Sequence, residues 1–135
     1  YLTYGDGVGD IDVTALVAYH KGHGRLATVT AASPVGRFGL LSLAEDGTVE
    51  KFEEKPEVSS SWVNAGFFVL KHGVLDLIKK DSTSWELDSL VQLTQNEQLL
   101  AFRHTGFWQP MDTLREKNLL NELWASGDAP WKVWE

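Results

Sequence analysis

The chain has 135 residues, of which 43% are hydrophobic, no cysteine, and a formal net charge of −7 from 19 acids and 12 bases. This length and apolar content suit one folded domain and exclude a disordered segment, and without cysteine there is neither a disulfide scaffold nor a thiolate metal site. The acidic balance argues against nucleic acid as a partner, and no apolar run reaches the roughly 20 residues that would span a membrane. We therefore expect a cytoplasmic protein that binds neither nucleic acid nor membrane.

The first quarter of the chain predicts a strand, a helix and a second strand. Residues 1–4 form an apolar run that predicts a short strand, ended by a glycine-rich turn over residues 5–9. A helix follows, capped by either Asp10 or Asp12, with apolar residues at helical spacing. The β-branched run 26–32 is typical of a strand covered on both faces. This order predicts a parallel βαβ unit.

The rest of the chain predicts a hairpin, two further strands and three helices. The hairpin spans residues 38–56, the strands 62–70 and 99–104, and the helices 74–80, 86–95 and 113–126. The last helix begins with a capping box, Thr113 and Glu116, and ends before Gly127. We expect one α/β unit over residues 1–135, with a mixed, mostly parallel sheet, flanking helices and a β-hairpin insertion. In such sheets ligands bind beyond the carboxyl ends of the strands.

Two aspartates follow strands at such ends. Asp6 stands in the glycine-rich turn, and Asp112 stands behind Phe107, Trp108 and Met111 where the last helix begins. Each has an ordinary explanation, as a turn residue or as an acid near a helix N-terminus. If the fold brings them to about 4 Å, their repulsion is on the order of 4 kcal/mol at an effective dielectric of about 20, and a divalent cation would remove it. Mg²⁺ commonly takes one or two carboxylates together with substrate phosphates.

Three further segments combine a polar side chain with glycine or proline. Lys55 precedes Pro56, and it is either a solvated surface charge or an ammonium held at a strand end to bind phosphate. Asn64 lies in an apolar strand two residues before Gly66, so its amide either has a structural partner or binds sugar hydroxyls. The basic loop 36–39 has the same two explanations. The spacing of the histidines indicates no complete ligand set for a metal.

Seven segments, taken in order, resemble one family closely. They are "YGDGV", "HGRLATVTA", "GRFG", "FEEKP", "WVNAGFFVL", "GFWQPMDTLREKN" and "LWASGDAPWKVW". They are similar to blocks of the glucose-1-phosphate cytidylyltransferases, a branch of the sugar-nucleotidyltransferase family. The tryptophan-containing blocks favour this branch over the uridylyl, thymidylyl and guanylyl branches. The resemblance implies a partial nucleotidyltransferase fold of the Rossmann-like kind.

The resemblance also implies roles for individual residues. Asp6 and Asp112 match the aspartates that hold Mg²⁺ against the nucleotide and sugar phosphates, and Lys55 matches a lysine that binds the sugar-1-phosphate. The positions that match residues around the sugar are Glu54, Asn64, Gly39, Gly66 and Trp108, of which Trp108 would form a wall of the pocket. The implied reaction is attack by glucose-1-phosphate on the α-phosphorus of CTP, which gives CDP-glucose and pyrophosphate.

The family's N-terminal half, with its glycine-rich loop for the base and triphosphate, has no counterpart among these segments. We therefore expect the chain alone to be impaired as an enzyme and its binding of CTP to need that half. An exposed sheet edge would favour homo-oligomers. Two alternatives stay open. The chain is a non-catalytic, truncated module that self-associates and binds a sugar phosphate, or it belongs to a nucleotidyltransferase that uses another nucleoside triphosphate.

Overall fold

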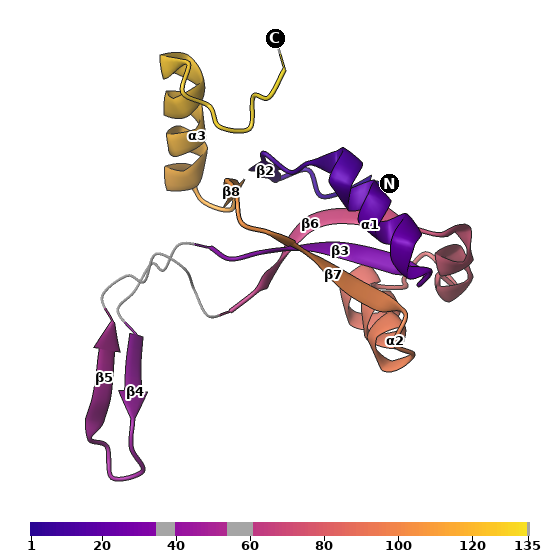
Figure 1. Ribbon diagram of the computed structural model, residues 1–135, viewed down its shortest axis with the longest axis horizontal. Helices are drawn as coiled ribbons and strands as arrows, with labels where there is room; N and C mark the ends of the chain where they lie inside the picture. Colours follow the sequence, from indigo (N-terminus) through magenta and orange to yellow (C-terminus); the bar gives the residue numbers. More distant parts are fainter. Residues whose placement is uncertain (35–39, 54–60, 135) are drawn as a thin grey trace.

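A four-stranded sheet forms the centre of the protein in the computed structural model, which describes residues 1–34, 40–53 and 61–134 (Figure 1). The strand order is β1-β6-β3-β7. These strands are β1 (Leu2–Thr3), β6 (Val63–Leu70), β3 (Ala27–Ala32) and β7 (Leu99–His104). β6 is antiparallel to both β1 and β3, whereas β3 and β7 are parallel. Three of the four strands therefore run in one direction, although only β3 and β7 pair in parallel. The expected mixed α/β sheet is confirmed.

The predicted βαβ unit needs one correction. Its two strands, β1 and β3, do run parallel, but β6 lies between them and pairs with both. β6 is eight residues long, and buried side chains occur on both of its faces, so it suits a central position. The order of local signals along the chain cannot show that a later strand takes the place between two earlier ones.

Helices cover both faces of this sheet. On one face α1 (Val13–His23) packs through the cluster of Ile11, Leu16 and Val69. On the other face, η1 (His72–Leu77), η2 (Trp85–Ser89) and α2 (Leu90–Gln95) pack through Val74 and Leu93. Consecutive residues of β6 pack against the helices on opposite faces of the sheet, because side chains alternate across a strand. Figure 1 shows α1 and α2 on the two sides of the sheet.

The ends of α1 and α3 follow the sequence signals. Asp12, rather than Asp10, caps α1, with Oδ1 accepting a hydrogen bond from the Ala15 amide at 2.8 Å. α3 (Leu114–Ser126) has the expected capping box between Thr113 and Glu116 and ends at Gly127.

Two other helix predictions were wrong in part. The helix expected over residues 74–80 is the six-residue 3₁₀ helix η1. No side chain caps its N-terminal end. The helix expected over residues 86–95 begins as the π turn η2. In that turn the Ser89 amide donates to the Ser84 carbonyl, five residues back.

The hairpin forms where the sequence indicates, with its ends outside the described residues. β4 (Leu40–Leu43) and β5 (Val49–Glu53) pair antiparallel. In the turn, Asp46 Oδ1 accepts from the Thr48 amide at 2.9 Å and Gly47 has a φ of 89°. Figure 1 shows this hairpin away from the central sheet. No helix among the described residues is long and apolar enough to cross a membrane.

Two histidines of α1 share one buried hydroxyl of β3. The Thr28 Oγ1 atom is 2.8 Å from His20 Nδ1 and 2.7 Å from His23 Nε2. A hydroxyl can donate to one ring nitrogen and accept from the other, so the arrangement suits neutral imidazoles. Burial, reinforced by the nearby charge of Lys71, lowers the pKa of both histidines.

We expect the free energy of unfolding to fall as the pH drops below about 6.5, the ordinary pKa of histidine. Below that pH the two histidines of the unfolded chain take up protons, whereas in the folded chain their lowered pKa keeps them neutral. The stability that the neutral histidines contribute is therefore complete above about pH 6.5 and is lost as the pH falls toward their lowered pKa in the folded state. Urea unfolding at pH about 7.5 and about 5.5 measures the slope of the free energy of unfolding against pH. A double variant, His20→Asn with His23→Gln, should reduce it, whereas His72→Gln, at an exposed histidine, should not. An unchanged slope in the double variant would contradict the assignment.

Candidate functional site

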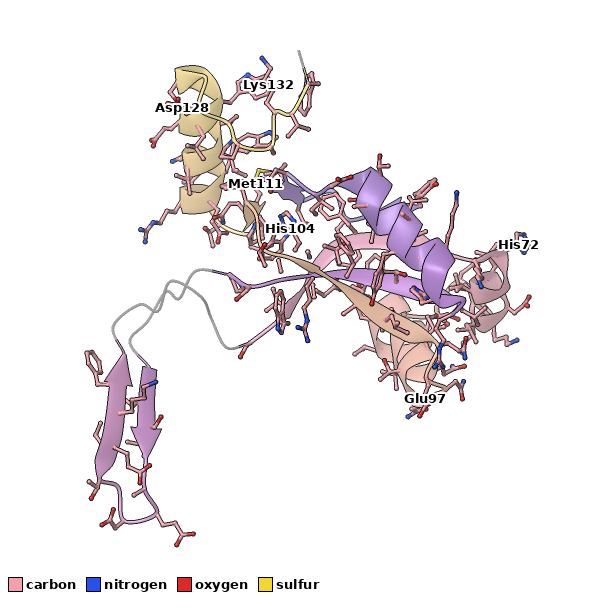
Figure 2. The ribbon with its side chains drawn as sticks, viewed as in Figure 1. His72, Glu97, His104, Met111, Asp128 and Lys132 are labelled. Atoms are coloured by element: carbon pink, nitrogen blue, oxygen red, sulfur yellow. The ribbon has the colours of Figure 1, made fainter. Side chains whose placement is uncertain are left out.

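A short two-stranded ribbon brings the two candidate aspartates together. β2 (Gly7–Gly9) pairs antiparallel with β8 (Trp108–Pro110). One step beyond this pairing the Met111 amide donates to the Asp6 carbonyl at 2.6 Å. Met111 lies at the base of α3, where the chain leaves β8 (Figure 2). Asp6 and Asp112 therefore stand at the same end of the ribbon, although 106 positions separate them in the sequence.

The glycine-rich segment was predicted as a turn, and this is corrected by the structure. Residues 7–9 form strand β2, because they pair with β8. This partner lies far along the chain, so the local sequence did not indicate a strand. A Cβ built on Gly7 would make ordinary van der Waals contact with Trp108, at 3.6 Å from Nε1, whereas a Cβ on Gly9 would come within 3.0 Å of the Phe107 carbonyl oxygen. The lack of side chains at both glycines hides any alternating pattern in the sequence.

The two carboxylates have the donor chemistry of a magnesium site. Both are exposed, and neither forms a hydrogen bond or ion pair with another residue in the part of the chain that the structure describes. No third acid, histidine or cysteine joins them there. Mg²⁺ prefers oxygen ligands and needs only one or two carboxylates when phosphates and water complete its shell. Asp6 and Asp112 therefore fit this cation as the ligands that a protein supplies.

Glu116 fixes the backbone at Asp112. Its buried carboxylate oxygen Oε2 accepts from the Asp112 amide at 3.0 Å, the Thr113 amide at 2.9 Å and the Thr113 hydroxyl at 3.0 Å. These bonds use the backbone of Asp112 and leave its own side chain for other contacts. The capping box was readable in the sequence, but the extra bond to the Asp112 amide was not.

Trp108 joins the ribbon to the central sheet. Its indole Nε1 donates to the Ala65 carbonyl of β6 at 3.0 Å. Trp108 is half-buried. Its role as a wall of the site stays a prediction.

Asn64 and Gly66 lie on either side of Ala65 in β6. The Gly66 amide donates to Asn64 Oδ1 at 2.8 Å, and the Tyr4 amide donates to the Gly66 carbonyl at 2.8 Å. Gly66 has a φ of 80°, and an added Cβ would come within 2.8 Å of the Tyr4 ring. Only glycine fits here, because both the conformation and the space exclude a side chain.

Tyr4 and Glu86 belong to the same region but were not singled out in the sequence. The Tyr4 hydroxyl donates to Glu86 Oε1 at 2.5 Å and accepts from Asn64 Nδ2 at 3.2 Å. Burial, together with the bond to Glu86, raises the pKa of Tyr4 to about 12. The hydroxyl therefore stays protonated at neutral pH. Because 82 residues separate the two partners, no local pattern could have shown the contact.

His104 and Asp10 lie in contact behind the ribbon. His104 Nε2 lies 3.0 Å from the Phe107 carbonyl and 3.1 Å from Asp10 Oδ1. The Asp10 amide also donates to the Phe107 carbonyl at 3.1 Å. These contacts fasten the loop before α1 to the loop before β8. Trp131 then stacks on Phe107, with ring centroids 5.5 Å apart, so the C-terminal segment packs against the same loop.

Five of the eight residues proposed from the sequence thus fall in one region. They are Asp6, Asn64, Gly66, Trp108 and Asp112. The other three, Gly39, Glu54 and Lys55, lie outside the described residues, so their roles stay predictions.

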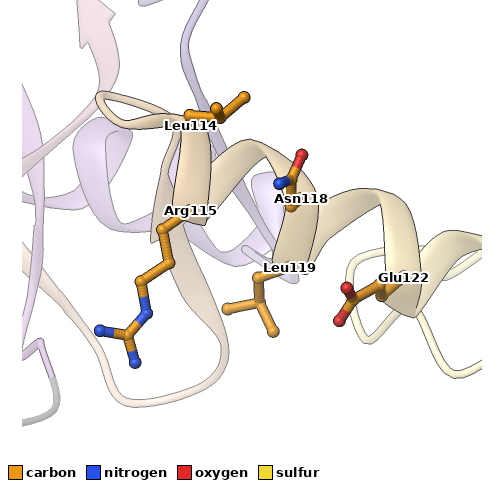
Figure 3. A pocket seen from close by; sticks show the side chains of 5 residues that line it. All are labelled: Leu114, Arg115, Asn118, Leu119 and Glu122. Carbon is orange, nitrogen blue, oxygen red and sulfur yellow. The ribbon is translucent and has the colours of Figure 1, made fainter.

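A hollow on α3 is separate from this site. It has a volume of about 550 Å³ and is lined by Leu114, Arg115, Asn118, Leu119 and Glu122 (Figure 3). All five side chains come from one exposed helix, so no groups from different elements converge on a ligand there. The chemistry that the two aspartates and their neighbours offer makes the end of the ribbon the stronger candidate.

Comparison with known proteins shows which family the chain resembles. The family model described as "Nucleotidyl transferase" matches residues 2–116. Glucose-1-phosphate cytidylyltransferase of Salmonella typhi is 53% identical over 134 residues, which are 99% of this chain and 52% of that protein. Mannose-1-phosphate guanylyltransferase catalytic subunit beta of Drosophila melanogaster is 34% identical over 121 residues, 84% of this chain and 33% of that protein.

The fold agrees as well. The crystal structure of HddC from Yersinia pseudotuberculosis superposes with a TM-score of 0.61 at 19% identity, covering 89% of this chain and 52% of that one. The chain spans about half the length of the cytidylyltransferases it matches. The family match extends over most of the chain, from β1 through Asp112 to the first turn of α3, and the chain therefore belongs to the nucleotidyl transferase family.

Proposed function

We propose that the protein to which this chain belongs transfers a cytidylyl group from CTP to glucose-1-phosphate, giving CDP-glucose and pyrophosphate. The placement of Asp6 and Asp112 at one end of the β2–β8 ribbon carries this proposal. The identity of 53% to a glucose-1-phosphate cytidylyltransferase supports the choice of base and sugar over the guanylyl relative at 34%.

In this reaction an oxygen of the sugar phosphate attacks the α-phosphorus of CTP. The bond between that phosphorus and the bridging oxygen breaks, and pyrophosphate leaves. Such a transfer needs positioning and charge neutralisation rather than a covalent intermediate. Mg²⁺, held by Asp6 and Asp112, would supply positive charge to the phosphates.

The chain's own residues would hold and shield the substrate. Trp108 covers one side of the site and excludes water from it, since its ring is anchored to β6 through the Ala65 carbonyl. Asn64, fixed by the Gly66 amide, would orient the sugar through its amide. Lys55 would bind the sugar phosphate, with Glu54 and Gly39 beside the sugar, as the resemblance implies.

Pyrophosphate release tests the proposal. The chain is mixed with Mg²⁺, glucose-1-phosphate and CTP, UTP, GTP or dTTP in turn, alone and together with the part of the Salmonella typhi relative that it does not match. We expect release with CTP above the other nucleotides when that part is present. Release with another nucleotide at a higher rate would contradict the cytidylyl assignment, and no release in any mixture would contradict the proposed transfer.

A further inference from the structure

We propose that Tyr4, Asn64 and Glu86, here called the hydroxyl-binding trio, read hydroxyl groups of the sugar ring and so determine which sugar phosphate the site accepts. This rests on the proposed function, and it adds Tyr4 and Glu86 to the residues that would contact the substrate.

The trio is assembled from three distant segments. Tyr4 follows β1, Asn64 lies in β6, and Glu86 lies in the π turn η2. The Tyr4 hydroxyl joins the other two, since it donates to Glu86 and accepts from Asn64. The Asn64 carbonyl oxygen is engaged by the Gly66 amide, which fixes the direction of its amide nitrogen.

Within the described residues the trio keeps one hydrogen-bond acceptor and one donor that are not used. Tyr4 has spent its only proton on Glu86, and Asn64 has spent one of its two amide protons on Tyr4. The second oxygen of Glu86 and the second amide proton of Asn64 have no partner among the described residues. An acceptor and a donor are thus held close together and exposed. A hydroxyl is both donor and acceptor, so neighbouring sugar hydroxyls suit this pair.

Charge decides which part of a sugar phosphate can lie here. The Glu86 carboxylate makes no ion pair within the described residues, so it would repel a phosphate that carries no cation. Asp6, which the proposed function gives to the cation, is two residues from Tyr4 along the chain. The neutral hydroxyls would therefore lie against the trio, with the phosphate at the cation held by the two aspartates.

The trio is also rigid before any ligand arrives. The Tyr4 ring packs on Phe68, with centroids 5.7 Å apart, and the Tyr4 amide donates to the Gly66 carbonyl at 2.8 Å. Glu86 is held in η2, where the Ser84 hydroxyl caps the Leu87 amide at 3.1 Å. π turns occur often at functional sites, where the widened backbone redirects a side chain. Binding would therefore cost little ordering of these groups.

Calorimetric titration of the chain with Mg²⁺ and glucose-1-phosphate tests the inference. Glu86→Gln keeps the shape and can still accept the Tyr4 proton through its carbonyl, but it removes the charge and offers a donor where the acceptor was. We expect it to weaken glucose-1-phosphate binding about 10- to 100-fold, the range for a hydrogen bond to a charged group. The affinity for inorganic phosphate with Mg²⁺ should not change. Glu122→Gln, on α3 (Figure 3), is the matched control and should bind like the parent.

Deoxy sugars complete the test. Among the 2-, 3-, 4- and 6-deoxy forms of glucose-1-phosphate, at least one should bind the parent more weakly by a similar factor and lose nothing further in Glu86→Gln. Equal affinity of Glu86→Gln and the parent for glucose-1-phosphate would overturn the inference and leave the proposed function standing. If the folded parent binds no glucose-1-phosphate at all, both the sugar-phosphate site and the inference are overturned. Circular dichroism of each variant establishes that it is folded.

Discussion

Replacing Asp112 by asparagine should weaken Mg²⁺-dependent binding of glucose-1-phosphate by about 100-fold, or close to 3 kcal/mol. The substitution preserves size and leaves the Asp112 amide bonded to Glu116, but it removes half of the negative charge that would hold the cation. Asp6→Asn should have an effect of the same order, because the two carboxylates share one end of the ribbon. Titration calorimetry in Mg²⁺ and in EDTA measures both variants.

Asp76→Asn provides the matched control. Asp76 is an exposed aspartate of η1, and its replacement should leave binding and stability as they are in the parent. If Asp6→Asn and Asp112→Asn both bind glucose-1-phosphate as tightly as Asp76→Asn does, the metal assignment is wrong. A loss of the folded signal in either variant would instead show that the carboxylates stabilise the fold.

Gly66→Ala should lower the free energy of unfolding by about 2–5 kcal/mol. An alanine at a φ of 80° costs about 1–2 kcal/mol in a left-handed conformation. The new methyl would also press on the Tyr4 ring at 2.8 Å, and overpacking of this kind costs about 1–3 kcal/mol. Moving Tyr4 would disturb its bonds to Asn64 and Glu86, so glucose-1-phosphate binding should weaken as well. Urea unfolding gives the stability change.

Gly24→Ala separates the two causes. Gly24 has a φ of 75°, and no atom lies within 4 Å of an added Cβ. This variant should show only the conformational cost, about 1–2 kcal/mol, and should bind glucose-1-phosphate like the parent. Equal destabilisation by Gly66→Ala and Gly24→Ala would mean that the Tyr4 ring yields freely and that the close packing in the site has no energetic weight.

The sequence predicts well those features that are decided within a few residues. The cap of α1 and the capping box of Thr113 and Glu116 each depend on a side chain that bonds to nearby backbone. Such signals are complete in a short window. The structure has the capping box as expected and places Asp12 as the cap of α1, a choice that the sequence left open between Asp10 and Asp12.

Features that depend on distant partners were less predictable. β2 is a strand only because β8 pairs with it, and β6 separates β1 from β3 because each of its two edges pairs with one of them. The resemblance to a family supplied Asp6, Asp112, Asn64 and Gly66, which spacing alone left open. Neither the residue spacing nor the family resemblance indicated Glu86. Its contact with Tyr4 depends on a π turn, which helical spacing does not predict.

The most direct test of this account is one titration of the unmodified chain with glucose-1-phosphate, first in Mg²⁺ and then in EDTA, with inorganic phosphate as the comparison ligand. The account predicts saturable binding in Mg²⁺, at least about 10-fold tighter than that of inorganic phosphate because the sugar hydroxyls add their own hydrogen bonds. It also predicts that EDTA removes the binding. Binding that is the same in EDTA, or a folded chain that binds no glucose-1-phosphate, would contradict the central claim that Asp6, Asp112 and their neighbours form a metal-dependent sugar-phosphate site.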